Sequence, residues 1–537
     1  MKNRATLTIP ERKALRLTVL CLALLGGAGL FWGYANPFYH LPPLALLFPA
    51  CLAVLGRLTP TAKGGFYAAW LCATIGNSAC LYWVSVPMHD FGLIPWPLTV
   101  PPLLALGGYL GLYGALFAVL YRLFRERLPF FAALILAAPL WAALDIAKGW
   151  LFTGFPWVSL ATAFVPWPEW TQGAALIGAH ALSGIYAMAA VAVAEARPVR
   201  ASFGQGSAIT PRKRSFRCFL LVFLCMGTLY GYGMTTLKTP APAGERIRIG
   251  LIQGNVDQNQ KWAPEYQYGT LARYLTLSEW TVNTSMGKVA TPVDFLIWPE
   301  TALPFYLETN VQLAERIANF SREFRVPIAF GAPGKGRPEE GGYYNRMWLQ
   351  TPTSPELRHY DKTHLVPFGE YVPLNLPIPF VEYFLQGLDF RPGRNSGSLR
   401  SGNLALGALI CYEAIFPALA QERVAEGANL LVNISNDAWF GRTSAPLQHL
   451  HLTAMRAVEQ GRYIVRSTNT GISGVISPKG IITVHGSLFR AEAVVGEAGL
   501  LTEVTPYHRA SAPISWACVL ATLAAAAYCL SAARKPA

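Results

Sequence analysis

The sequence predicts a membrane α-helical bundle joined to an α/β domain, and three observations favour this fold class. Only 14% of the 537 residues are charged, whereas a soluble domain usually has about 25%. The deficit is uneven, because apolar runs fill residues 14–235 and 512–533 while charges occur throughout residues 238–511. Short strand and helix patterns alternate within that charged part, as in α/β domains. We therefore expect an N-terminal membrane region over 1–237, a soluble domain over 238–511 and a final membrane helix with its tail over 512–537.

The apolar runs have the length of membrane helices. About 20 apolar residues cross a bilayer core as a helix. The first run follows four basic residues but is long and lacks a clear cleavage site, which argues against a cleaved signal peptide. We expect about eight transmembrane helices, at residues 14–34, 41–57, 64–84, 98–121, 129–148, 171–195, 216–235 and 512–533.

Basic residues alternate between the connecting segments. Lys and Arg occur in the N-terminal tail and in the second, fourth and sixth connections, whereas segments 35–40, 85–97 and 149–170 contain none. Cytoplasmic loops of membrane proteins carry the excess of Lys and Arg. The pattern predicts cytoplasmic termini and places residues 238–511 on the opposite side of the membrane.

The net charge of +14 does not indicate nucleic-acid binding. Outside residues 238–511 there are 19 Lys and Arg against 6 Asp and Glu, and inside them there are 25 against 24. The basic excess therefore belongs to the membrane loops, and the soluble domain has no basic stripe. We expect no nucleic-acid partner.

The soluble domain reads as strands and helices in alternation. In α/β folds the working residues tend to lie where strands end at their carboxyl side. A further strand is possible within 347–362, before a loop. The patterns predict strands at 246–256, 293–300, 326–333, 404–413, 428–437, 463–471 and 473–480, and helices at 264–278, 311–324, 415–426 and 447–461.

Three polar residues follow these strands. Glu300 ends the run "FLIWPE", Lys362 follows the possible strand that ends in "HYDK", and Cys411 follows "LALGALI". Cys411 is the only cysteine between Lys238 and Ser511. An exported domain would pair its structural cysteines, so this thiol is either reactive or an inert core side chain.

A carboxylate, an ammonium and a thiol together form an acyl-transfer set. The carboxylate removes the thiol proton, the ammonium stabilises the oxyanion, and the sulfur carries the acyl group as a thioester. The backbone N–H of Tyr412 could add to the oxyanion hole. Taken singly, Glu300 is more simply read as an acid near a helix N-terminus, and Lys362 as a solvated surface charge.

Other chemistries have weaker signals. His449 and His451 are one residue apart, so on a helix they face different sides, and we predict no metal site. The pair Asn436-Asp437 is read as a turn, and His364 as structural. The chain has no Walker-type glycine loop and no CxxC pair, so we expect no cofactor.

Four stretches carry a resemblance: "LIWPE", "YDKTHLVPFGEYVP", "LICYE" and "NISNDAWFG". They resemble the nitrilase superfamily, and with flanking membrane helices they resemble its membrane-embedded branch, the apolipoprotein N-acyltransferases. The resemblance implies a nitrilase-like α-β-β-α sandwich with Glu300 as general base, Lys362 as charge stabiliser and Cys411 as nucleophile. It also implies supporting roles for four residues, one of them a tryptophan of a mobile arm: Glu370, Tyr412, Glu413 and Trp262.

The resemblance implies a two-step, ping-pong reaction. An acyl chain passes from a phospholipid, typically phosphatidylethanolamine, to Cys411 as a thioester. It then passes to the α-amino group of the N-terminal S-diacylglyceryl cysteine of an apolipoprotein, the final step of lipoprotein maturation. The implied location is the bacterial inner membrane with the catalytic domain in the periplasm, and we expect a monomer.

Two other functions stay open at this point. A membrane-anchored nitrilase-type amidase acting on a small amide would keep the same three residues. A transporter or receptor would carry charges within its membrane helices, where Asp145 and Lys148 are nearly the only candidates. The Pro-rich apolar stretch Val372–Phe390 favours a lipid substrate if it faces the bilayer, although it could instead fill the core of the domain.

Overall fold

The chain folds into two compact units. The first comprises Met1–Tyr82, Pro97–Lys238 and Arg509–Ala537, and the second comprises Trp83–Trp96 and Thr239–His508. The segment Trp83–Trp96, inside the expected membrane region 1–237, therefore groups with the soluble unit. The computed structural model describes residues 8–196, 211–240, 244–258, 260–286, 292–336, 341–373, 390–394 and 399–532.

The first unit is helical, as predicted. Among the described residues, six helices are long and apolar enough to cross a membrane. The bent helix pair Ala62–Cys80 and Tyr82–Asp90 adds a seventh span if the two helices together form a single crossing. Pro42–Leu58 is a shorter apolar helix. The fold class is thus confirmed, with a helix count near the expected eight. The helices are α1 (Ile9–Gly33), α2 (Leu47–Leu58), α3 (Ala62–Cys80), α5 (Trp96–Arg127), α6 (Phe130–Ile135), α7 (Ala137–Lys148), α8 (Ala174–Ala196), α9 (Pro211–Lys238) and α15 (Pro506–Ala532).

Glycines allow close helix contacts in this unit. Gly56 of α2 lies against the backbone of Ala118 in α5, and Gly184 of α8 lies against the backbone of Ala138 in α7. A Cβ at either glycine would collide with the facing carbonyl. Membrane helices associate largely through such close packing, because lipid supplies little hydrophobic force between them.

The charges buried in this unit are paired. Lys148 Nζ lies 2.7 Å from Asp145 Oδ1 within α7. Glu195 near the end of α8 forms ion pairs with three arginines from α2, α5 and α9: Arg57, Arg125 and Arg214. Pairing lowers the cost of charges in a membrane protein, so these contacts are consistent with a role in holding the helices together.

The second unit contains two six-stranded sheets. Their strand orders are β12-β1-β2-β3-β4-β5 and β11-β10-β9-β8-β7-β6. Strands β1 to β3 are parallel in the first sheet, and β7 to β9 are parallel in the second. The strands are β1 (Arg246–Gln253), β2 (Phe295–Ile297), β3 (Ile328–Lys335), β4 (Tyr343–Thr351), β5 (Ser354–Asp361), β6 (Leu399–Ser401), β7 (Leu404–Ile410), β8 (Leu430–Ser435), β9 (Ile464–Thr468), β10 (Gly474–Ile476), β11 (Ile482–His485) and β12 (Glu492–Gly499).

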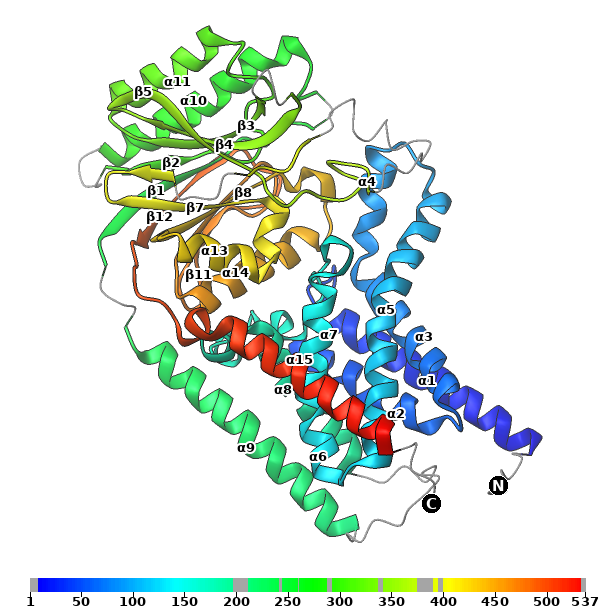
Figure 1. The fold of residues 1–537 in the computed structure, drawn as a ribbon. Helices are drawn as coiled ribbons and strands as arrows, with labels where there is room; N and C mark the ends of the chain where they lie inside the picture. Colours follow the sequence, from blue (N-terminus) through cyan, green and yellow to red (C-terminus); the bar gives the residue numbers. More distant parts are fainter. Residues whose placement is uncertain are drawn as a thin grey trace. The chain divides into compact units, whose positions relative to one another are not determined.

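Helices cover the outer faces of both sheets (Figure 1). The pair α10 (Pro264–Met286) and α11 (Val311–Phe324) covers the first sheet, and α13 (Pro417–Ala425) with α14 (Ala445–Gln460) covers the second. Side chains alternate accordingly: Phe295 and Ile297 join the core between the sheets, whereas Leu296 joins the core under the helices. The result is the predicted α-β-β-α sandwich.

The sequence patterns located most elements of this unit. Helix α11 has the bounds that the pattern predicted, and the possible strand at 347–362 contains the end of β4, the turn after it and all of β5. Strands β6, β11 and β12 were missed. β6 has only three residues, and β11 and most of β12 are partly exposed, so they lack a clear apolar run. Residues 374–389, most of the apolar stretch Val372–Phe390, lie outside the described residues, and the predicted role of that stretch stays a prediction.

The segment Trp83–Trp96 packs on the loop that follows β8. Trp83 Nε1 donates to Gln448 Oε1 at 3.0 Å, and its ring lies 4.9 Å from that of Phe440. The rings of Phe91 and Trp439 are 4.7 Å apart. This segment, which includes α4 (Ser85–Asp90), therefore covers the "NDAWFG" stretch beside the candidate site.

Candidate active site

Glu300 lies at the carboxyl end of β2, where the chain leaves the first sheet. Its side chain is buried, and Oε2 accepts a hydrogen bond from the backbone N–H of Asn436 at 2.9 Å. Asn436 directly follows β8 of the second sheet, so this bond links the ends of the two sheets. Oε1 accepts from Asn345 Nδ2 of β4 at 2.7 Å.

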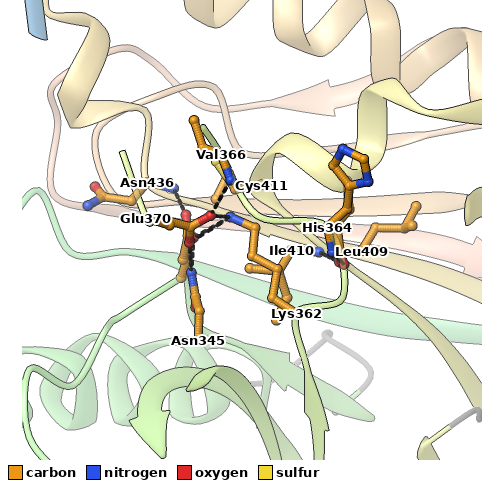
Figure 2. A network of polar contacts seen from close by, with 12 residues as sticks. Asn345, Lys362, His364, Val366, Glu370, Leu409, Ile410, Cys411 and Asn436 are labelled. Carbon is orange, nitrogen blue, oxygen red and sulfur yellow. Dashed lines mark hydrogen bonds and ion pairs between the residues drawn. The ribbon is translucent and has the colours of Figure 1, made fainter. Parts of the chain in front are cut away.

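Lys362 follows β5 and lies between two carboxylates. Its Nζ is 2.9 Å from Glu370 Oε2 and 3.5 Å from Glu300 Oε1. Asn345 Nδ2 also donates to Glu370 Oε1 at 2.8 Å, so one amide bridges both acids. Figure 2 shows Lys362 and Asn345 reaching these carboxylate oxygens, with Cys411 beside them. The backbone N–H of Val366 donates to Glu370 Oε2 at 2.8 Å and fixes this acid in the loop after Lys362.

The surroundings keep Lys362 charged. Its side chain is only 1% exposed, and burial by itself lowers the pKa of an ammonium. The negative charges of Glu370 and Glu300 outweigh burial, so the pKa of Lys362 lies above its ordinary value. Lys362 therefore stays an ammonium within the cluster, and its charge acts on Cys411.

Cys411 occupies a strained backbone position. It follows β7, begins the 3₁₀ turn Cys411–Ile415, and has a φ of +51°, which non-glycine residues rarely adopt. Such strain persists only where surrounding contacts enforce it, and it gathers at functional sites. Burial, followed by the charge of Glu300, raises the pKa of Cys411, while Lys362 acts in the opposite direction. The thiol is therefore protonated at neutral pH and needs a base during attack.

Glu413 connects the Cys411 turn to the Lys362 loop. Its Oε2 accepts from the backbone N–H of Ile410 at 2.7 Å. Its Oε1 accepts from the backbone N–H of Thr363 at 2.7 Å and that of His364 at 3.1 Å. The hydroxyls of Thr363 and Tyr360 also donate to Oε1, at 3.0 and 2.8 Å. One buried carboxylate thus holds the residues next to the sulfur and next to the ammonium.

The remaining predicted residues lie at different distances from this cluster. Tyr412 is buried and packs its ring against those of Phe416 and His364, at centroid distances of 5.1 and 5.8 Å. Trp262 lies in the turn before α10 and is partly buried. The sequence therefore identified residues that the fold brings together (Glu300, Lys362, Glu370, Cys411, Tyr412 and Glu413), whereas Trp262 has no polar or ring contact with the described residues of the cluster.

Sequence reasoning missed a buried group beneath Cys411. His449 Nε2 lies 3.1 Å from the carbonyl oxygen of Cys411, which can only accept, so Nε2 carries the proton. Nδ1 then accepts from Arg466 Nη2 at 3.1 Å, and the same guanidinium lies 2.7 Å from Asp437 Oδ2. Burial lowers the pKa of His449, which fits this neutral tautomer. A histidine on a helix gave no local signal for this contact with the nucleophile turn.

Asn345 is the second residue that the sequence did not suggest. It lies within a strand, where a polar residue usually faces solvent, yet here it is buried and bridges Glu300 and Glu370. Across the described ranges, no group of three or more His, Cys, Asp or Glu side chains is arranged to hold a metal ion. The arrangement supports proton transfer and nucleophilic attack by the residues themselves.

Comparisons with known proteins agree with both units. Two family models match: "Apolipoprotein N-acyltransferase N-terminal domain" over residues 28–192 and "Carbon-nitrogen hydrolase" over residues 248–500. An apolipoprotein N-acyltransferase of Geobacter metallireducens is 36% identical over 525 residues, covering 97% of each chain. One of Nitrosomonas europaea is 32% identical over 493 residues, covering 89% of this chain and 90% of the relative. Among solved structures, the Saccharomyces cerevisiae protein Nit3, of the nitrilase superfamily, is 20% identical with a TM-score of 0.38, covering 51% of this chain and 97% of its own.

Proposed function

This chain belongs to the apolipoprotein N-acyltransferase family, and we propose that it transfers an acyl chain from a phospholipid to the N-terminal amino group of a lipoprotein precursor. The acceptor group is the α-amine of an S-diacylglyceryl cysteine. The observation that supports this most is the strained, buried Cys411 beside an ammonium held by two carboxylates. Acyl transfer needs a nucleophile, a base and an oxyanion partner, and these residues supply all three.

The first half-reaction loads the enzyme. Cys411 Sγ attacks the ester carbonyl carbon of the donor while Glu300 takes the thiol proton, and Lys362 stabilises the oxyanion that forms. The carbon–oxygen bond to the glycerol then breaks, and Glu300 returns the proton to the leaving alkoxide. A thioester on Cys411 and a lysophospholipid result. Because the pKa of the thiol is raised, the base acts during attack rather than before it.

The second half-reaction uses the same residues. The neutral acceptor amine attacks the thioester carbonyl, and Glu300 takes a proton from the attacking nitrogen. The carbon–sulfur bond breaks, Glu300 returns the proton to Sγ, and an amide is released. Glu370 and Asn345 hold Lys362 and Glu300 in place, and Glu413 and His449 hold the loops that carry the reacting groups.

The apolar helices and the family make this chain an integral membrane protein. We further propose the bacterial inner membrane as its location, with cytoplasmic termini and a periplasmic catalytic domain, because the basic loops alternate in that sense. Phosphatidylethanolamine is the proposed donor and the monomer the proposed active form. Trp262 is proposed to act on a mobile arm near the substrate.

Mass spectrometry of the purified protein with phospholipid tests the proposal. We expect one acyl group on Cys411, removable by hydroxylamine, and its disappearance when a diacylglyceryl lipopeptide with a free N-terminus is added. Cys411→Ala should give no adduct, and Glu300→Gln should reduce its formation sharply. Turnover of small amides without any acyl adduct from phospholipid would contradict the proposal and support the amidase.

A further inference from the structure

Lys261 is a buried amine that the mechanism above does not use. It lies in the turn between β1 and α10 and is 0% exposed. Its Nζ has no hydrogen-bond partner among the described residues. An unpaired ammonium away from water is costly, so a side chain of this kind calls for an anion.

This amine belongs to the neighbourhood of Glu300. The backbone N–H of Asn436 donates to Glu300, and Asn436 Nδ2 donates to Gln258 Oε1 at 2.7 Å, three residues before Lys261. Burial lowers the pKa of Lys261 to about 7, and the charge of Glu300 acts against this decrease. The turn that carries Lys261 is thus linked through Asn436 to the backbone beside Glu300.

Lys362 pairs with two carboxylates and is assigned to the oxyanion, so it does not balance the separate charge of a phosphate on the donor. The cluster of Glu300, Glu370 and Lys362 has a formal charge of −1, which repels an anionic donor. A protonated Lys261 brings the formal sum to zero. The acceptor amine has no negative group at its reacting end, whereas a phospholipid carries a phosphodiester next to its esters.

We propose that Lys261 binds the phosphate of the acyl donor while the donor's ester lies at Cys411. This inference rests on the proposed function. The glycerol backbone places the phosphate a few bonds from the scissile ester, and the turn of Lys261 is joined through Gln258 and Asn436 to Glu300, the base that serves that ester. Two residues that precede Lys261 in the chain, Asp257 and Gln260, are exposed, so this part of the chain reaches the surface. The long lysine stem lets the ammonium follow the ligand.

Binding of the phosphate has a pH signature. The anion favours the protonated amine, so above pH 7 the donor must bind together with a proton. The donor KM of the wild-type enzyme should therefore rise as the pH increases from 6.5 to 8.5, within the range set by a pKa of about 7. Lys261→Met should raise the KM at pH 6.5 by about 10- to 100-fold, the usual worth of a hydrogen bond to a charged group, and remove its pH dependence. Lys261→Arg should keep a low KM at all these pH values.

The test compares two donors on full-length protein in mixed micelles. Phosphatidylethanolamine carries the phosphate and diacylglycerol does not, and acyl-enzyme formation on Cys411 is followed by mass spectrometry. Lys261→Met should lose rate with phosphatidylethanolamine and keep it with diacylglycerol. Lys335→Met, an exposed lysine at the end of β3, is the matched control and should change neither. The melting temperature of Lys261→Met should equal or exceed that of the wild type, because the variant removes an unpaired buried amine.

The outcomes separate the inference from the function on which it rests. No acyl-enzyme from any phospholipid in the wild type would overturn the proposed function itself. If the wild type forms the acyl-enzyme normally and Lys261→Met has an unchanged donor KM, only the role of Lys261 is overturned. The same holds if Lys261→Met loses the same fraction of its rate with both donors. Inorganic phosphate added to the diacylglycerol reaction distinguishes the sources of the anion. If it alters the wild-type rate but not that of Lys261→Met, the site is for free phosphate and the lipid assignment is wrong.

Discussion

Replacing Glu413 by Gln tests whether one carboxylate aligns the sulfur with the ammonium. The amide can keep its oxygen towards Thr363, His364 and Tyr360, but its NH₂ group then faces the backbone N–H of Ile410. Loss of the hydrogen bond from Ile410, together with the two N–H groups that then face each other, costs about 1–3 kcal/mol. Each remaining hydrogen bond to the side chain becomes a bond to a neutral group and weakens by about 1 kcal/mol. Because such terms are not additive, we expect a local loss of about 3 kcal/mol.

The predicted result is a large kinetic effect with a moderate effect on stability. A loss of about 3 kcal/mol, if expressed in the barrier, slows acyl-enzyme formation by about 100-fold. Rapid-quench measurement of a single turnover on Cys411 gives the rate, and a thermal melt gives the stability. Glu497→Gln is the matched control, because that side chain is 59% exposed and lies 3.9 Å from the exposed Arg246 at the surface. If Glu413→Gln loads at the wild-type rate, the alignment role assigned to this carboxylate is wrong.

Three further variants test other contacts. Glu300→Gln should stop acyl transfer but accelerate the alkylation of Cys411 by iodoacetamide at pH 8–9. The reason is that burial and the negative charge of Glu300 together raise the pKa of the thiol, and the variant removes that charge. Slower alkylation in the variant would contradict this effect of Glu300 on the thiol pKa. Arg466→Met should destabilise the domain by about 3–5 kcal/mol in thermal melts, because Asp437 is left buried without its partner. Folding lowers the pKa of Asp437, chiefly because the charge of Arg466 outweighs the effect of burial. The stability that this ion pair contributes is therefore complete above the unfolded pKa of about 3.9 and decreases as the pH falls. The difference in melting temperature between the wild type and Arg466→Met should become smaller towards acid pH. Trp83→Phe should keep most of the ring packing and lower the stability of the second unit by about 1 kcal/mol, because the hydrogen bond to Gln448 is lost. An unchanged melting temperature would show that this contact of the segment Trp83–Trp96 does not stabilise the second unit.

The sequence predicted a candidate site whose residues the fold brings together, because strand ends are local features. Glu300 and Cys411 each follow a short apolar run, and parallel strands gather their carboxyl ends at one edge of a sheet. A lone cysteine in a domain that the loop charges predict to be exported added a signal of its own. The membrane helices were equally visible, since length and hydropathy define them without any knowledge of packing.

The sequence could not show which polar residues assist that chemistry. Asn345, Glu413 and His449 act through partners 25 to 53 residues away along the chain. These pairings follow from the register of β4 and β5 and from how the two sheets stack. No local periodicity encodes either of them.

By itself, the amino-acid sequence determined the two-part architecture and the run of apolar helices, and it singled out the three side chains that we propose to react. Only the tertiary structure decided that Glu370 and Asn345 lie next to the ammonium and that the carbonyl of Cys411 fixes the tautomer of His449. It also decided that Lys261 is buried with no hydrogen-bond partner for its amine among the described residues. The physical reason is that hydrophobic patterns fix which face of an element is buried, whereas hydrogen-bond partners depend on distances between elements that only the packed fold sets.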